Sequence, residues 1–340
     1  MVASATVRIM SAEEIAAQSI GDAPLLRLPD VSTVFAERQM RLSQLARGHA
    51  MEAYMTLMAA VAGAQQTLVA KFVDVDIPAP SALAVARAHG MSALPAATWS
   101  RHSVWQSMLR ELVALVRPTA PDSAYATLDA LSVADSEFLE AQADALLGAT
   151  KASFDIAAAP FIAAALQVYW TRMAAAVGAS PAASADPFPR TNDDTVCPCC
   201  GSGPTASVTR ATGGTQGHRY LHCSLCNCEW HMVRIRCPRC ASSKSLAYHA
   251  LDASTAETDA DGAAARAALA SIQAETCDEC NHYLKIMHTD RDPLIEPVAD
   301  DLATVTLDLL VADEGKRRHG RNLMLLFDES AIAPPDPGAP

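Results

Sequence analysis

The cysteines are the residues of this 340-residue chain whose type and spacing point most directly to chemistry. All ten lie between Cys197 and Cys280, and eight of them form four Cys-x-x-Cys pairs. Two intervening residues allow a tight backbone turn, here called a knuckle, and two knuckles together can supply a tetrahedral four-thiolate site. The predicted metal ligands are Cys197, Cys200, Cys223, Cys226, Cys237, Cys240, Cys277 and Cys280.

Four knuckles predict two metal ions, but their spacing leaves the pairing of the knuckles open. The simplest arrangement joins the first knuckle with the second and the third with the fourth, each pair forming a ribbon or rubredoxin-like unit. An interleaved arrangement joins the first with the third and the second with the fourth. Closed four-thiolate sites accept iron or zinc, so either metal fits. A purely structural role, in which the metals only fold a region with little core, is the alternative to a redox role.

Two cysteines remain outside the pairs. Cys199 lies inside the first knuckle, and Cys228 lies two residues after the second. If these two knuckles share a metal, we expect the two extra thiols to lie close together. The simpler interpretation is a pair of small, half-buried side chains, since cysteine often behaves as a small hydrophobic residue. The alternative is an oxidisable pair beside the metal.

Other reactive side chains give weaker patterns. The paired cysteines already fill two sites, so we interpret the nearby histidines as groups that support the ligands or lie at the surface. These are His218, His222, His231, His249, His282 and His288. The sequence shows no Ser-His-Asp or Cys-His arrangement in a supporting context and no glycine-rich phosphate loop, so no catalytic residue is predicted.

The distribution of charged residues indicates which kinds of partner the protein can bind. Five arginines and one acid, Glu229, lie between Cys197 and Cys240; the arginines are Arg210, Arg219, Arg234, Arg236 and Arg239. A divalent ion with four thiolates carries a charge of about −2, which these arginines would offset. The alternatives are a solvated basic face and a nucleic-acid-binding zinc ribbon, but the formal net charge of −12 argues against nucleic acid as a partner. The basic segment 316–321 is a candidate docking surface, the alternative being a solvated turn.

The region before the cysteines is predicted to be an all-helical domain over residues 1–178. Half of the residues are hydrophobic and only 5% are aromatic, a composition typical of helices built on small side chains. Apolar periodicity predicts helices near 30–48, 51–73, 79–90, 101–116, 122–131, 134–147 and 156–177. No alternating strand pattern precedes residue 196.

The rest of the chain predicts a change of architecture. Three prolines make 179–196 a linker, and short alternating runs at 218–223 and 229–236 predict strands beside the knuckles. We expect one metal-binding module at 197–236 and a second at 237–330. The second would contain a helix within the Ala-rich segment 255–273 and a terminal helix over 302–311, and 331–340 would be a flexible tail. The fold class is multidomain α and β.

The N-terminus lacks the apolar core of a signal peptide, and the most apolar stretch, 161–178, is interrupted by Gln167 and Arg172. We therefore expect a cytoplasmic protein without membrane insertion. In that compartment clustered thiols hold metals more often than they form disulfides.

At the level of whole motifs, the sequence resembles the formate dehydrogenase accessory protein FdhE family. The likeness runs from about residue 24 to Phe327 and is most specific around the knuckles. It is carried by Pro24–Pro29 followed by Phe35, and by Cys197–Ser202, Arg219–Cys226, Trp230–Cys240, Glu275–Lys285 and Glu296–Thr304. Cys199 and Cys228 depart from the usual family pattern, so the resemblance assigns them no role.

The resemblance implies a large all-α domain followed by two small rubredoxin-like modules that bind iron, with zinc as the alternative occupant. It also implies a cytoplasmic protein that is not itself an enzyme. Such a protein binds the catalytic subunit of respiratory formate dehydrogenase and assists its maturation. A nucleic-acid-binding zinc ribbon and a rubredoxin-like electron carrier remain alternative functions. A homo-oligomer is compatible with the sequence, and the partner-binding surface is unknown.

Overall fold

The computed structural model describes residues 24–148, 153–180, 188, 190–212, 215–251 and 270–326. Residues 181–187 and 189 of the predicted linker, most of the Ala-rich segment 255–273 and the predicted tail at 331–340 lie outside these residues. In the described part of the chain, no helix is both long enough and apolar enough to cross a membrane.

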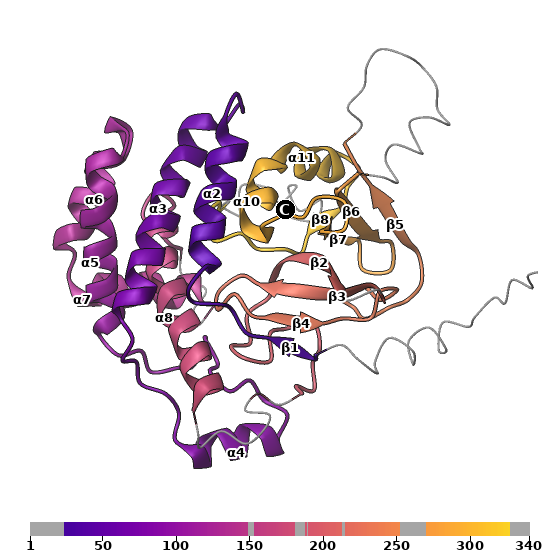
Figure 1. The fold of residues 1–340 in the computed structure, drawn as a ribbon, viewed down its shortest axis with the longest axis horizontal. Coiled ribbons are helices and arrows are strands. Elements are labelled where there is room, and N and C mark those ends of the chain that lie inside the picture. The colour runs from indigo at the N-terminus through magenta and orange to yellow at the C-terminus, as the bar shows by residue number, and fades with distance from the viewer. Residues whose placement is uncertain are drawn as a thin grey trace, which may run out of the picture.

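The N-terminal half forms the helical bundle that the apolar periodicity predicted (Figure 1). Its helices are α2 (Val34–Ala46), α3 (Glu52–Lys71), α4 (Pro80–Ala88), α5 (Val104–Val116), α6 (Asp122–Val133), α7 (Ser136–Leu146) and α8 (Ala159–Ala179), with a 3₁₀ turn at Arg117–Thr119. Helix α8 packs against α3, α5 and α7. It is central because its apolar residues are too many for one face, and Tyr169 and Trp170 are fully buried.

The C-terminal half contains one eight-stranded sheet in the order β1-β4-β3-β2-β7-β6-β5, with β8 also paired to β7. The strands are β1 (Leu26–Arg27), β2 (Pro204–Thr212), β3 (Thr215–Cys223), β4 (Glu229–His231), β5 (Leu246–His249), β6 (Ile272–Cys277), β7 (His282–His288) and β8 (Arg317–Arg318). Strand β2 pairs in parallel with β7, with Ser207 opposite Ile286. The two predicted modules therefore share a single sheet.

Strand β1 corrects the prediction that no strand precedes residue 196. It pairs with β4, with Leu26 opposite Trp230, and so Leu26 and Arg27 lie at the edge of the cysteine-rich sheet (Figure 1). A two-residue strand has no alternation of its own, and its backbone partners come from residues two hundred positions away. The strand predicted over 229–236 is also too long, since β4 ends at His231.

The helix predicted over 302–311 is wrong as a single element. Two helices, α10 (Pro297–Ala303) and α11 (Val305–Asp313), meet at Thr304. The Thr304 hydroxyl donates to the carbonyl of Asp300, and such a local bond competes with continued helix. At the other end, the Glu296 carboxylate accepts from the backbone N–H groups of Val298 and Ala299 and fixes the start of α10.

Candidate metal centres

The first and second knuckles meet in one four-sulfur group, here called the first centre. Cys197 Sγ lies 3.5 Å from Cys226 Sγ, and Cys200 Sγ lies 3.4 Å from Cys223 Sγ. Four sulfurs at about 2.3 Å from a tetrahedral ion would be about 3.8 Å apart, so little adjustment is needed to hold one. The third and fourth knuckles form the second centre. There Cys237 Sγ lies 3.7 Å from Cys280 Sγ, and Cys240 Sγ lies 3.8 Å from Cys277 Sγ.

The structure thus brings the eight predicted ligand residues into two groups of four. The first knuckle joins the second and the third joins the fourth, which is the simplest arrangement expected from the sequence and not the interleaved one. In both centres the chemistry of the donor set, four thiols with no other ligand type, fits a closed iron or zinc site.

Each knuckle is followed by a residue in the left-handed backbone region. These residues are Gly201 (φ 75°), Asn227 (φ 58°), Ala241 (φ 59°) and Asn281 (φ 57°). Only the glycine was recognisable from sequence as suited to this turn. Asparagine tolerates the conformation, whereas alanine does so at a cost in backbone energy, so residue type alone marks these turns incompletely.

The two centres differ in exposure. The four sulfur-bearing residues of the first centre are at most 1% exposed. In the second centre Cys237 and Cys277 are buried, but Cys240 is exposed and Cys280 is half-buried. The same ligand set is therefore enclosed in one case and open to solvent in the other.

The helical half encloses the first centre through backbone hydrogen bonds to the first knuckle. The N–H of Leu94 donates to the Cys199 carbonyl at 2.7 Å, and the N–H of Ala96 donates to the Cys200 carbonyl at 2.9 Å. The Gln167 amide from α8 donates to the carbonyl of Ser224 at 2.8 Å. The segment 92–96 could not be identified from the sequence, because backbone donors in a loop leave no residue pattern.

Burial also governs ionisation in the first centre. It raises the pKa of the Cys197 and Cys226 thiols well above the ordinary value. At Cys200 burial again opposes ionisation, but hydrogen bonds from Cys197, Cys223 and Cys226 outweigh it and hold the pKa well below the ordinary value. Without a cation, the enclosed cluster would therefore retain most of its protons, and metal binding must release them.

The second centre contains one activated thiol. Burial raises the pKa of Cys237 to about 12. The pKa of Cys240 is lowered, because the backbone N–H of Ser242 and the neighbouring thiols outweigh its small desolvation. An exposed thiol with a lowered pKa is the one expected to react first with electrophiles when no metal is bound.

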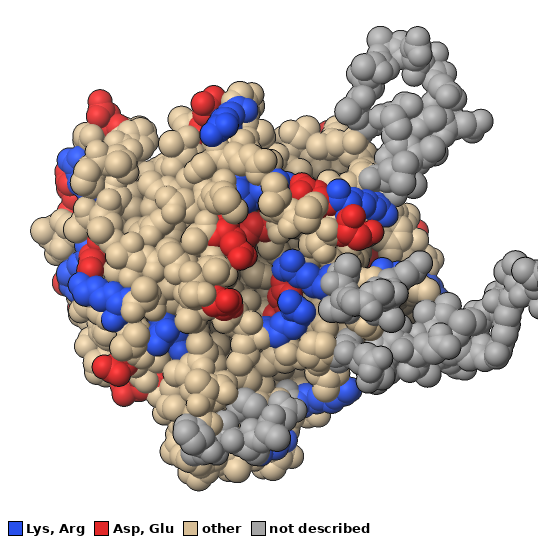
Figure 2. Space-filling view, viewed as in Figure 1, with Lys and Arg blue, Asp and Glu red and all other residues tan. Residues whose placement is uncertain are grey.

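Three of the five arginines near the first three knuckles, Arg210, Arg219 and Arg236, form ion pairs, whereas Arg234 and Arg239 are exposed. Arg210 pairs with Glu229, and Arg236 pairs with Asp194. Arg219 lies 2.9 Å from Glu275 with both side chains buried, and this pair links β3 to β6. On the face shown in Figure 2, Lys and Arg side chains lie among Asp and Glu side chains. The charge of the three paired arginines is therefore balanced by carboxylates.

The basic segment 316–321 is half-buried except for Arg317, which is exposed, and two of its charged side chains form ion pairs. Lys316 pairs with Asp278, and Arg318 pairs with Asp301 at 2.6 Å and with Asp308 at 3.0 Å. Because Arg317 and Arg318 form β8, the segment is a sheet element rather than the solvated turn considered from sequence.

The histidines occupy varied places. His282 Nδ1 lies 2.6 Å from the carbonyl oxygen of Cys280, directly beside the second centre. His222 is buried with no hydrogen bond to either ring nitrogen within the described residues, and its Nδ1 lies 3.6 Å from Glu229. His218 and His231 stack edge-on, and His288 lies 2.9 Å from Gln273.

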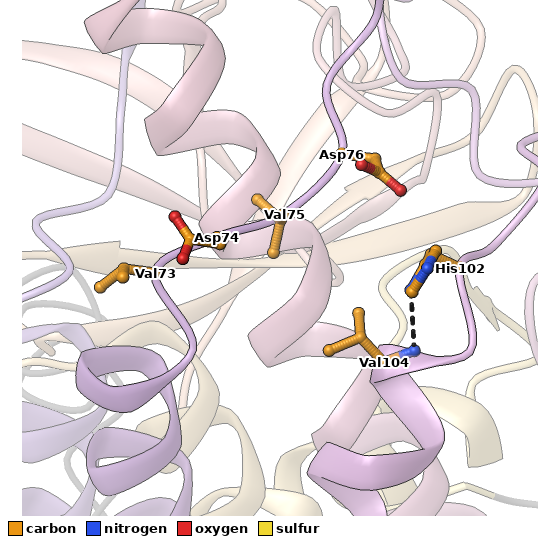
Figure 3. A pocket seen from close by; sticks show the side chains of 6 residues that line it. All are labelled: Val73, Asp74, Val75, Asp76, His102 and Val104. Atoms are coloured by element: carbon orange, nitrogen blue, oxygen red, sulfur yellow. Dashed lines mark hydrogen bonds between the residues drawn. The ribbon is translucent and has the colours of Figure 1, made fainter.

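A shallow pocket of about 280 Å³ lies in the helical half, away from the cysteines. It is lined by Val73, Asp74, Val75, Asp76, His102 and Val104 (Figure 3). His102 accepts a hydrogen bond from the backbone N–H of Val104. The pocket contains no metal ligand of either centre.

The fold and the two centres define a class of protein: a helical bundle closed against a sheet that contains two four-cysteine groups. The chain matches three family models along its length, "FdhE, N-terminal" over residues 23–186, "FdhE, central domain" over 196–234 and "FdhE, C-terminal domain" over 235–325. It belongs to the FdhE family, as the sequence motifs indicated.

Comparisons with individual relatives give the same family. The chain is 35% identical over 330 residues to the "Protein FdhE homolog" of Yersinia enterocolitica, covering 95% of this chain and all of that one. It is 36% identical over 329 residues to the same-named protein of Edwardsiella ictaluri, with the same coverage. The crystal structure of the FdhE protein from Pseudomonas aeruginosa matches with a TM-score of 0.73 and 36% identity, covering 89% of this chain and 99% of that chain.

Proposed function

We propose that this protein is an accessory and maturation factor for respiratory formate dehydrogenase, which binds the catalytic subunit of that enzyme in the cytoplasm. The observation that carries the proposal is family membership over nearly the whole chain, including the cysteine-rich region. The proposed division keeps the helical domain at 1–178 and two rubredoxin-like modules at 197–236 and 237–330.

In this proposal the two centres have different tasks. Each would hold one iron ion, or zinc in its place, through four thiolates. The first centre would fix the knuckles to the helical domain, since it is fully enclosed. The second centre would lie at the surface that meets the partner, because Cys240 is exposed and apolar Val233 and Ile235 lie exposed just before its first knuckle.

We also propose that the protein is not itself an enzyme. A catalytic metal site keeps one coordination position open for water or substrate, whereas both four-sulfur groups would fill all four positions of a tetrahedral ion. Assistance would therefore come from binding the partner rather than from chemistry at the metal.

The proposal is tested by capture and complementation. Tagged protein should co-purify with the catalytic subunit, and a strain lacking the gene should lose formate dehydrogenase activity. Ile235→Asp should weaken both capture and complementation severalfold. Val133→Asp is the matched control, since Val133 is 82% exposed on α6 in the helical half. Full enzyme activity in the deletion strain, or failure of the unmodified protein to capture the subunit, would refute the accessory function.

A rubredoxin-like electron carrier is the second candidate, favoured by the exposure of Cys240 and the partial exposure of Cys280. Electron transfer needs a metal edge near solvent, which only the second centre offers. Protein purified without oxygen should then contain iron that is reduced and reoxidised without loss. A protein that contains only zinc after such purification would eliminate this candidate.

A further inference from the structure

A third group of sulfurs lies beside the first centre. The Sγ atoms of Cys199, Cys226 and Cys228 all lie within 4.8 Å of one another, and all three residues are fully buried. Cys226 belongs to both groups. The first and second knuckles therefore gather six thiols, two more than one tetrahedral ion can use.

The fold holds the two extra thiols firmly in place. The carbonyl of Cys199 accepts from Leu94, and the carbonyl of Cys228 accepts from the N–H of Cys223 at 2.8 Å. Between Cys226 and Cys228, Asn227 takes a left-handed conformation that turns the chain back toward the knuckle. Thus Cys199 is held by a contact from the helical half and Cys228 by a contact within its own knuckle.

The helical half also anchors Asn227 itself. Its amide oxygen accepts from Arg38 at 2.7 Å, and its amide nitrogen donates to the Thr171 hydroxyl at 2.9 Å. Both partners are fully buried. The three-sulfur group is therefore positioned by side chains that come from α2 and α8, far away in the sequence.

Three-thiolate coordination selects a particular ion. Three sulfurs at about 2.3 Å around an ion in their own plane would be about 4 Å apart, which agrees with the observed group. Among the described residues the group has no fourth His, Cys or carboxylate ligand, and its burial leaves no room for solvent access. Zinc and iron in thiolate sites take four ligands, whereas Cu(I) is soft, favours thiolates and accepts three.

We propose that Cys199, Cys226 and Cys228 form a second metal site in this region, which binds one Cu(I) ion and shares the Cys226 sulfur with the ion of the first centre. No electron is transferred on binding. The Cys199 and Cys228 thiols each release a proton and form one Cu–S bond, and the Cys226 thiolate forms the third as a bridge.

The charge change is modest for a buried site. One cation enters and two protons leave, so the region becomes more negative by a single charge. Arg38 lies beside the turn that contains Cys228, and its Nη1 has no hydrogen-bond partner within the described residues. A guanidinium with a free donor is suited to a neighbourhood that gains negative charge, although Glu296 already pairs with its other edge.

The test uses the full-length, zinc-loaded protein, reduced and handled without oxygen. It is titrated with Cu(I) supplied as the acetonitrile complex, and copper and zinc are counted after desalting. We expect one copper per chain to be retained alongside two zinc ions, with three sulfur neighbours by X-ray absorption. Cys199→Ala and Cys228→Ala should each lose the copper and keep both zinc ions. Ser224→Ala is the matched control: it changes one small buried side chain of the same knuckle and should keep the copper.

The measurement on the unmodified protein decides the matter even if a variant fails to fold. Retention of two zinc ions with no copper, or displacement of one zinc for each copper bound, would overturn the copper site. Equal copper retention by Cys228→Ala would overturn it as well. The inference rests on the proposed occupancy of the first centre, and the outcomes are distinguishable: protein without zinc contradicts the four-thiolate sites, whereas two zinc ions without copper contradict only the third site.

Discussion

The two four-cysteine centres have the same ligands, nearly the same sulfur spacing and opposite surroundings. The first is enclosed by the loop at 92–96 and by Gln167 of α8. The second is supported by its own module, where the N–H of Cys237 donates to Ser242 and the N–H of Asp278 donates to Ser245. The ligand pattern decides that a metal can bind, and the packing decides how strongly the rest of the protein depends on it.

The difference predicts that the two metals contribute unequally to folding. We infer that loss of the first metal opens the interface between the bundle and the sheet, because buried thiols and knuckle carbonyls then lose their fixed geometry. Loss of the second should leave the bundle intact.

Replacement of one ligand in each centre gives the largest contrast. Cys200→Ala should remove a large share of the about 10–16 kcal/mol that a structural four-thiolate metal supplies, and abolish cooperative unfolding of the bundle. Cys240→Ala, the matched variant in the second centre, should lose one metal but keep the helical circular-dichroism signal and its thermal transition. Metal content and thermal melts check both. Equal melting temperatures of the two variants would show that the two centres contribute equally to the stability of the bundle.

The buried pair between Arg219 and Glu275 tests whether the two modules fold as one unit. Arg219→Met leaves a buried carboxylate unpaired and should cost about 3–5 kcal/mol of unfolding free energy in urea. Arg219→Met combined with Glu275→Leu should recover the part of that loss that comes from the unpaired carboxylate, but not the part from the bonds that Arg219 donates to the carbonyls of Arg234 and Arg236. Lys71→Met, which breaks an exposed pair with Glu111, should cost at most about 1 kcal/mol. Additive losses in the double variant would mean that the modules are not coupled through this pair.

Acid should weaken the side of the sheet near the first centre through Glu229. Burial opposes ionisation of this carboxyl, but His222 and Arg210 outweigh it and lower its pKa from 4.5 to about 2. A folded-state pKa below the unfolded value stabilises the fold above pH 4.5, and this contribution, roughly 3 kcal/mol, is lost as the pH falls toward 2.

Glu229→Gln should therefore flatten the acid limb of the curve of unfolding free energy against pH. The control is Asp129→Asn, whose carboxylate pairs with Arg117 in an exposed position and should leave that limb unchanged. An acid limb of the same steepness in Glu229→Gln would exclude this carboxyl as its source.

The rate of metal release should also differ between the two centres, and this is the smallest difference in free energy that we expect. A chelator with a coloured metal complex should remove one ion quickly and the other at least about tenfold more slowly, since an enclosed site must open locally first. Cys240→Ala should abolish the fast phase alone. A single phase that releases both ions would contradict the difference in exposure.

The sequence predicted local structure well wherever the signal repeats along one element. The bundle helices follow from apolar periodicity, and α3 and α8 bury residues on more than one face because they are apolar on more than one face. Strand β1 and the break at Thr304 were not predicted. The first exists only because β4 supplies its hydrogen-bond partners, and the second depends on a single hydroxyl.

The predicted ligand residues, their number and the family are readable from the sequence, because a knuckle is a local motif whose two sulfurs are three residues apart. The pairing of the knuckles, the enclosure of the first centre and the meeting of Cys199 and Cys228 at Cys226 follow from the folded chain. The physical reason is that burial and pairing depend on contacts such as the one between Leu94 and Cys199, which join segments about a hundred residues apart. Nearly every residue has a backbone N–H donor of this kind, so the residue type does not indicate which one makes such a contact.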